Sequence, residues 1–165
     1  MASGDTLVVF TARDNQPPSA AFATFDTRNG HLVLDFDPTT DEDSIFEGLL
    51  PRNYGSGGIT LLLVWAATSA TSGSCRWQAS FERLEDEGTD IDADSFDTAQ
   101  SAGGTAPAAT GALQYTTIAF TNGQIDGLLV GEAFRLKVGR DANGTTGTDD
   151  MTGDAELLRA EVKET

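Results

Sequence analysis

The chain is built from short segments in which apolar and polar residues alternate, and turn residues separate these segments. In residues 132–140, for example, Phe134, Leu136 and Val138 alternate with polar or charged residues. Successive side chains of a strand point to opposite faces, so a period of two is typical of a strand with one buried face. No long apolar stripe with the helical spacing of 3.6 residues accompanies these segments. The pattern therefore predicts an all-β protein.

About eight strands are expected, over residues 6–11, 21–27, 31–37, 59–67, 74–84, 113–121, 132–140 and 155–163. The dipeptide Asn29-Gly30 predicts a tight hairpin turn between the second and third of these. Residues 44–50 fit either a further strand or the end of a short helix that begins near Thr40. Residues 124–130 fit a single helical turn.

The segments 59–67 and 74–84 are expected to form the centre of the fold. The first is apolar nearly throughout, which is typical of a central strand covered on both faces. The second alternates strictly, and a small polar turn joins the two. We expect an antiparallel hairpin of these two segments, with Trp65 and Trp77 in the core.

Eight strands in one domain favour an antiparallel β-sandwich of the jelly-roll type. An immunoglobulin-like arrangement is the nearest alternative, but the chain has a single cysteine and lacks the Cys…Trp…Cys spacing. We expect one domain over residues 1–165, since this length suits a single core. Within it, residues 101–111 are rich in Gly, Ala, Pro and Thr and are expected to form a flexible, exposed loop. Cys75 lies in an apolar alternation and is expected to be buried.

The net charge of −16, from 26 acidic and 10 basic residues, excludes several partners. A nucleic-acid-binding protein needs a basic surface to neutralise phosphates, and an anionic membrane would be repelled for the same reason. The longest apolar run, residues 59–67, is too short to span a bilayer. Residues 1–5 have no basic or apolar region of the kind that forms a signal peptide.

The residues that usually carry catalysis do not form a recognisable constellation. His31 is the only histidine, so a site with several histidine ligands is excluded, and a solvated position at a strand end is expected. Residues 55–58 are glycine-rich but contain no lysine and precede a strand, which differs from a phosphate-binding loop. Glu82, Glu85 and Asp86 are close in sequence but lie where a strand runs into an acidic loop. We expect no enzymatic activity and no cofactor.

Two groups of aspartates are weak calcium candidates. Asp90, Asp92 and Asp94 have the spacing that begins an EF-hand loop, but Ser95 and Ser101 stand where that loop has Gly and Glu. The second group lies in one long polar loop and consists of Asp149, Asp150 and Asp154, with Asp141 and Asn143 nearby. Solvated turns capped by aspartate side chains are the favoured interpretation for both groups.

Carbohydrate binding by a β-sandwich usually requires exposed aromatic rings that stack on sugars. Trp65 and Trp77 fall on core-facing patterns, so they are not available for this purpose. Tyr54 and Tyr115 are the rings that the sequence leaves as plausible exposed ones.

Three stretches together carry a resemblance: Gly48–Tyr54 leading into residues 59–67, Gly131–Ala142, and Asp149–Leu158. The chain resembles small virion proteins of tailed bacteriophages, of the kind encoded among head genes. Some of these are jelly-roll decoration, or cement, proteins that sit as trimers on the capsid surface. The resemblance covers most of the chain and implies no active site.

The resemblance implies a structural protein on the capsid surface of the virion, made in the host cytoplasm. Its partners would be the major capsid protein and further copies of itself in a homotrimer, and it would stabilise the shell to which it binds. The interface candidates are Arg13, Arg28, Arg52 and Tyr54. The alternative is a receptor- or glycan-binding module of a phage fibre or baseplate.

Overall fold

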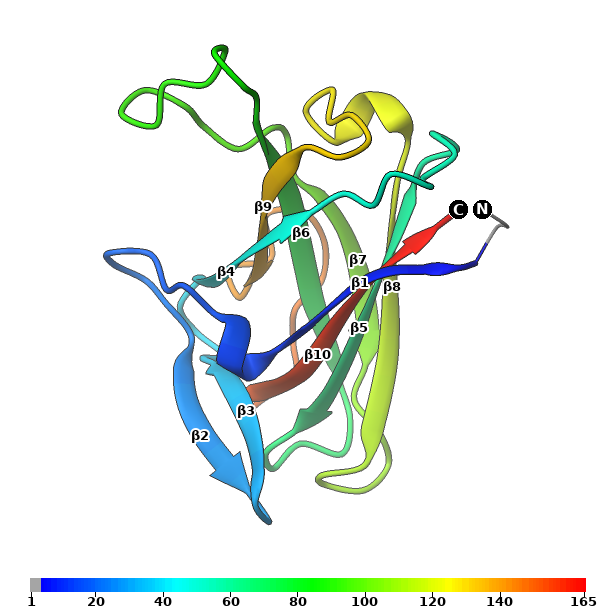
Figure 1. Cartoon of the computed structure of the whole chain (residues 1–165). Coiled ribbons are helices and arrows are strands. Elements are labelled where there is room, and N and C mark those ends of the chain that lie inside the picture. Colours follow the sequence, from blue (N-terminus) through cyan, green and yellow to red (C-terminus); the bar gives the residue numbers. More distant parts are fainter. Residues whose placement is uncertain (1–3) are drawn as a thin grey trace.

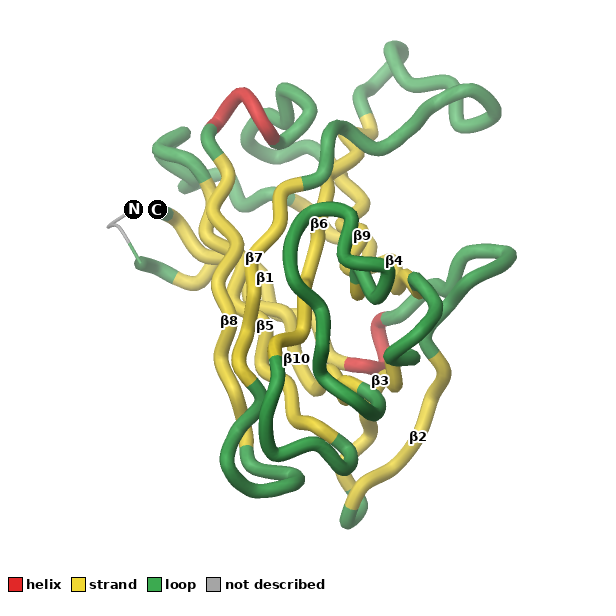
Figure 2. The backbone as a smooth tube through the Cα atoms, turned by 180° about the vertical axis from the view of Figure 1, so that it is seen from behind, coloured by secondary structure: helices red, strands yellow, loops and turns green. Residues whose placement is uncertain are grey.

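The computed structural model describes residues 4–165, which form two antiparallel β-sheets packed face to face (Figure 1). Figure 2 shows that strands make up the body of the molecule and that the loops gather largely at its two ends. The strands are β1 (Thr6–Thr11), β2 (Thr24–Arg28), β3 (His31–Phe36), β4 (Glu42–Leu49), β5 (Ile59–Ala67), β6 (Ser74–Leu84), β7 (Gln100–Thr105), β8 (Leu113–Phe120), β9 (Ala133–Arg140) and β10 (Ala155–Glu164). Two short 3₁₀ turns, η1 (Ala12–Asp14) and η2 (Asn122–Gln124), complete the elements. The expected all-β antiparallel sandwich is confirmed.

The first sheet has the strand order β2-β3-β10-β5-β8, with β1 also paired to β10. The second sheet has the order β4-β9-β6-β7. In the first sheet, β3 and β1 share one edge of β10, while β5 occupies the other edge. The hairpin predicted at Asn29-Gly30 joins β2 and β3, and both residues have the positive φ that such a turn requires.

The predicted hairpin of residues 59–67 and 74–84 is wrong, although both strands have the predicted bounds. β5 lies in the first sheet and β6 in the second, so the short connection carries the chain from one sheet to the other. Trp65 and Trp77 then face each other across the core, with ring centroids 5.8 Å apart. Because the two strands lie in facing sheets, the inward apolar side chains of β5 pack against those of β6. Paired strands of one sheet would place these side chains next to each other on the same face.

Three other expectations need adjustment. The region after Thr40 is strand β4 and not a short helix, in agreement with the alternative left open. The exposed loop predicted over residues 101–111 is wrong in its first half, because Gln100–Thr105 form β7. Only a backbone without a side chain fits there: a Cβ atom on Gly104 would lie 2.2 Å from Oγ1 of Thr116. The helical turn expected over residues 124–130 is wrong: the 3₁₀ turn η2 covers Asn122–Gln124 and shares only Gln124 with that range.

The predicted burial of Trp65, Trp77 and Cys75 is confirmed. Trp65, Trp77 and Cys75 are fully buried, and burial raises the pKa of the Cys75 thiol above its ordinary range. His31 is exposed at the start of β3, as expected. Within residues 4–165, no helix has the length and apolar character needed to cross a membrane.

β1 and the end of β10 bring residues far apart in sequence together. The backbone N–H of Gly4 donates to the carbonyl of Glu164 at 2.7 Å, and the N–H of Glu164 donates to the carbonyl of Asp5 at 2.9 Å. From there the two strands run antiparallel, with Thr6 opposite Lys163 and Thr11 opposite Arg159.

Candidate functional site

A groove of about 390 Å³ lies on the outer face of the first sheet, at the end that carries the β2–β3 turn. Its floor is apolar and comes from three strands, with Val33, Ala66 and Leu158. Arg28 and Asn29 belong to one wall, and the loop before β8 forms the other with Thr110 and Gly111. A concave, largely apolar surface with a few fixed polar groups is the usual form of a small-molecule site.

The Arg28 side chain is fixed in this wall by a short ion pair. Its Nη1 lies 2.5 Å from Oε2 of Glu156 and also donates to the carbonyl of Ala67 at 3.1 Å. The Glu156 side chain is nearly fully buried, whereas the Arg28 side chain is about one third exposed. The guanidinium packs on Gly111, where φ is +75° and a Cβ atom would lie 2.9 Å from Nε. Glycine at this position therefore allows the two walls to meet.

Tyr115 extends the apolar floor of the groove along β8. Its side chain is 59% exposed, and the register places it opposite Val64 of β5. Leu113, which lines the groove, is also exposed and lies opposite Ala66. Tyr115 does not line the groove, but it lies two residues after Leu113 on the same face of β8, so its exposed ring adjoins the groove and offers a flat apolar face for packing.

Asp35 lies beside the groove on β3, directly opposite Glu156 of β10. Its Oδ1 atom is buried and has no hydrogen-bond partner among residues 4–165. Burial, followed by the negative charges of Glu156, Asp26 and Asp154, raises the pKa of Asp35 to about 7. This carboxyl group is therefore partly protonated at neutral pH.

The raised pKa of Asp35 predicts that folding stability falls as the pH rises from about 4 to about 7. The folded state keeps this proton up to the raised pKa, while the unfolded chain releases it near the ordinary value. The stabilisation is therefore complete at low pH and is lost as the pH approaches neutrality. Asp35→Asn should be more stable than the parent above about pH 7 and similar to it near pH 4, measured by urea unfolding. Asp86→Asn, in an exposed loop, removes the same charge and is the control; parallel pH profiles of the two variants would contradict the prediction.

The structure does not gather the four predicted interface residues on one surface. Arg28 lies in the groove, Arg13 is exposed in η1, and Arg52 packs beside Gly131 near the opposite end of the sandwich. Tyr54 is only 5% exposed, so the expectation of an exposed ring is wrong for this residue. Its hydroxyl accepts a hydrogen bond from the backbone N–H of Gly58 and fixes the turn before β5.

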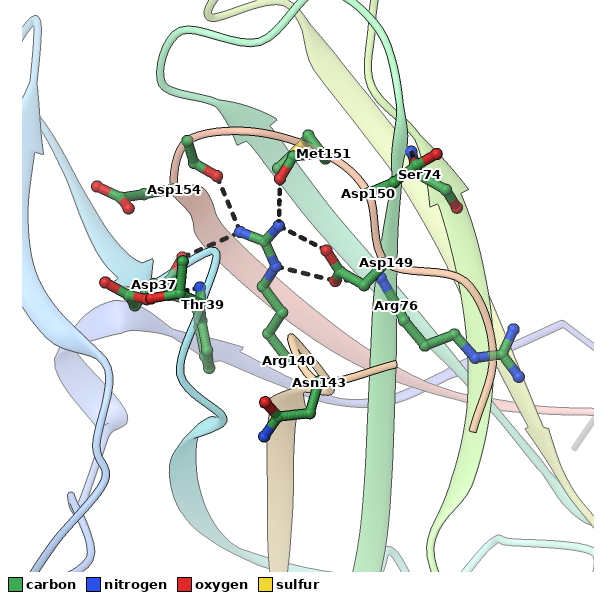
Figure 3. A network of polar contacts seen from close by, with 12 residues as sticks. Asp37, Thr39, Ser74, Arg76, Arg140, Asn143, Asp149, Asp150, Met151 and Asp154 are labelled. Carbon is green, nitrogen blue, oxygen red and sulfur yellow. Dashed lines mark hydrogen bonds and ion pairs between the residues drawn. The ribbon is translucent and has the colours of Figure 1, made fainter. Parts of the chain in front are cut away.

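The second aspartate group lies around a buried arginine that the sequence analysis missed (Figure 3). Nη2 and Nε of Arg140 bind the two carboxylate oxygens of Asp149 at 2.7 and 3.0 Å, and both side chains are 1% exposed or less. The guanidinium also donates to the backbone carbonyls of Phe36, Met151 and Gly153. Arg140 follows Phe134, Leu136 and Val138 on the inward side of β9, and this register is the signal that could have revealed it.

Several other aspartates of the two regions accept hydrogen bonds from nearby backbone N–H groups. Oδ1 of Asp150 accepts from the backbone N–H of Ser74, and Asp90 and Asp94 accept from backbone N–H groups in their own loop. The two carboxylate oxygens of Asp141 accept from the N–H and hydroxyl groups of Thr145 and Thr146. In the part of the chain that the structure describes, no three His, Cys, Asp or Glu residues are arranged to hold a metal ion.

The carboxylates at the end of β6 are also engaged by arginines. Glu82 pairs with Arg135 at 2.6 Å, and Glu85 pairs with Arg83 at 3.0 Å. Arg83 additionally binds Glu132 through two nitrogens at 2.6 Å each. Glu82 and Glu85 are therefore members of structural ion pairs.

Neither a protein-family model nor a curated protein matches the chain. Among solved structures, it is similar to part of an exo-β-1,3-galactanase from Phanerochaete chrysosporium, with a TM-score of 0.51 and 13% identity over 98% of this chain and 29% of the galactanase. The chain thus spans less than a third of that enzyme. Lower scores are found for the xylan-binding CBM22-1 domain of Paenibacillus barcinonensis Xyn10C (0.40, 11% identity, 99% and 96% of the two chains) and a cellulose-specific CBM28 module (0.38, 14%, 87% and 80%). The galactanase match agrees with the β-sandwich fold.

Proposed function

We propose that this chain is a carbohydrate-binding β-sandwich module that holds a glycan in the groove beside Tyr115. The observation that carries the proposal is an exposed aromatic ring on β8 next to an apolar groove whose polar wall is fixed by the Arg28–Glu156 pair. Tyrosine offers a large, rigid contact area at low entropic cost, which suits recognition of a sugar ring. The shared fold with part of a galactanase solved with galactose agrees with this role.

The apolar C–H face of a sugar ring would pack on Tyr115 and the neighbouring Val64. Its hydroxyl groups would meet the polar rim, where Asn29, His31 and Thr110 line the groove. The proposal is for binding without hydrolysis. Glu156 is held by Arg28, and Asp35 lies beside the groove without lining it, so the two do not form a freely accessible pair of carboxylates.

The test is a glycan array followed by calorimetric titration of the bound sugars, with Tyr115→Ala, Tyr115→Phe and Phe25→Ala. We expect Tyr115→Ala to weaken binding at least about tenfold, because an anchoring aromatic contact is lost. Tyr115→Phe keeps the ring and should retain most of the affinity. Phe25 is similarly exposed but is paired with the core residue Leu34, so it lies on the other face of the sheet from Tyr115, and Phe25→Ala is the matched control. Absence of any bound glycan, or equal losses in the two alanine variants, would refute the proposal.

The capsid decoration protein indicated by the resemblance is the second candidate. One observation favours it: the outward side chains of β5, Leu62 and Val64, remain partly exposed, and Val9 lies exposed on the same face. The sequence predicts that both faces of this strand are buried, and a second protein chain bound here would bury the outer face. Sedimentation velocity and binding to expanded phage shells are the test. A monomer without affinity for shells would remove this candidate.

A further inference from the structure

Apolar side chains, four of them exposed and two half-buried, lie at the end of the molecule opposite the groove. We call this the end patch; it consists of Leu49, Leu84, Ile91, Leu129, Val130 and Ala133. Ile91 is 86% exposed and Leu49 is 56% exposed, so water covers apolar surface that no other part of residues 4–165 buries. Clustered exposed apolar residues on a soluble protein are typical of an interaction site.

The strand register places part of the end patch in one row. Leu49 of β4 lies opposite Ala133 of β9, and Ala133 lies opposite Leu84 of β6, all on the outer face of the second sheet. A hollow of about 390 Å³ is lined by Leu84, Ile91 and Ala133, together with polar groups of the neighbouring loops. The hollow is large enough to receive an apolar side chain of a partner.

The surroundings of the end patch are strongly acidic. Residues 85–97, which carry Ile91, contain seven acidic residues and no basic residue. Glu85, Asp86 and Glu132 line the hollow itself; Glu85 and Glu132 share Arg83, so the three carboxylates outnumber the one guanidinium that binds two of them. The adjacent row of the sheet contains Glu47, Arg135 and Glu82, but Arg135 is paired with Glu82, so exposed Glu47 remains unmatched in this row. The rim therefore presents a negative potential around an apolar centre.

The apolar centre and the acidic rim together indicate which kind of partner can bind the end patch. A second copy of the chain, at −16, would be repelled, as would nucleic acid and an anionic membrane. A basic polypeptide matches both features, because interfaces combine an apolar centre with a rim of complementary charge. We propose that the end patch docks a basic polypeptide segment, which inserts an apolar side chain into the hollow and places Lys or Arg residues against residues 85–97.

This docking surface is independent of the proposed glycan groove. In Figure 1 the loop that follows β6 projects at the top of the molecule, whereas the β2–β3 turn beside the groove lies at the bottom. Both surfaces could be occupied at the same time, so the protein would connect a glycan to a basic protein.

The test is a selection from a displayed library of short random peptides against the intact protein. We expect enrichment of sequences in which Leu, Phe or Trp is flanked by Lys or Arg. Synthetic versions of a selected peptide, one with the apolar residue changed to Ser and one with the basic residues changed to Glu, should each bind at least about tenfold more weakly. High salt should weaken binding of the parent peptide, since its charges meet the rim in solvent. No enrichment, or enrichment of acidic sequences, would overturn the proposal.

Variants locate the contact. Ile91→Ser and Leu49→Ser change exposed residues, so folding should be preserved, and each should weaken the selected peptide at least about tenfold. Phe25→Ser, at an exposed apolar residue that lines neither the groove nor the hollow, should leave peptide affinity unchanged. A loss in Phe25→Ser equal to that in Ile91→Ser would place the peptide elsewhere. Pelleting with vesicles that contain anionic lipid should leave the protein in the supernatant, and co-sedimentation would identify a lipid surface in place of a polypeptide.

Discussion

Arg140→Met should lower the free energy of unfolding by about 3–5 kcal/mol, because removal of one partner from a buried ion pair leaves the other charge uncompensated. Asp149 has about 1% exposure and would lose the guanidinium that binds both of its carboxylate oxygens. The carbonyl oxygens of Phe36, Met151 and Gly153 would lose a charged donor at the same time. Urea unfolding monitored by the fluorescence of the two buried tryptophans measures the change.

Two further variants separate the ion pair from general effects of charge. Arg159→Met removes the same charge from an exposed position of β10 and should change stability by less than about 0.5 kcal/mol. Arg140→Met combined with Asp149→Leu removes both charges and should recover part of the loss. A double variant as unstable as the sum of the single variants would show that the pair is not coupled. The prediction would then fail.

Gly104→Ala should destabilise the protein by about 1–3 kcal/mol, because the added methyl group has no space between the sheets. Its Cβ atom would lie 2.2 Å from Oγ1 of Thr116 and 2.9 Å from Cζ2 of Trp65. Thr116 cannot simply turn away, since its hydroxyl accepts the hydrogen bond from Nε1 of Trp65. The close approach of β7 to β8 at this edge of the sandwich therefore depends on glycine.

The neighbouring glycine provides the matched control. A Cβ atom on Gly103 would lie no closer than 3.3 Å to another atom, the mobile Oγ of Ser74. Gly103→Ala should therefore be neutral or slightly stabilising, since alanine loses less backbone entropy than glycine in a strand. Thermal unfolding of both variants under the same conditions decides the point, and equal melting temperatures would contradict the steric explanation.

The strands were predictable from sequence where an alternating or continuous apolar pattern ended at clear turn residues. The bounds of β5 and β6 are identical to those expected, and β9 differs by one residue. Their pairing was not predictable, because the sheet to which a strand belongs depends on contacts between distant segments. β7 was missed because Gly103 and Gly104 are not typical strand residues, and the close approach of Trp65 and Thr116 that requires glycine at position 104 leaves no local pattern.

Less of the candidate site could be read from the sequence. Two rings were expected to be exposed, and of these only Tyr115 is. Tyr54 is buried, and its hydroxyl accepts a hydrogen bond from the backbone N–H of Gly58. The groove combines segments around Arg28, Ala66, Gly111 and Leu158, so no stretch of sequence contains it. The alternation of β9 places Arg140 on the inward face, and this could be read from the sequence. Its partners could not, because they come from the loop before β10, which folds back over the guanidinium.

The antiparallel pairing of β1 with β10 has a mechanical consequence. Residues 4–5 and residue 164 lie at the same end of this pair, and the hydrogen bonds of antiparallel strands run across the strands. A tension that pulled the two ends of the chain apart would load the bond between Gly4 and Glu164 first and then each following bond in turn. Such a pair opens like a zipper, one bond at a time, whereas a pair pulled from opposite ends shares the load. The β1–β10 pair is therefore weaker against force applied through residues 4 and 164 than the same hydrogen bonds would be if they were loaded together.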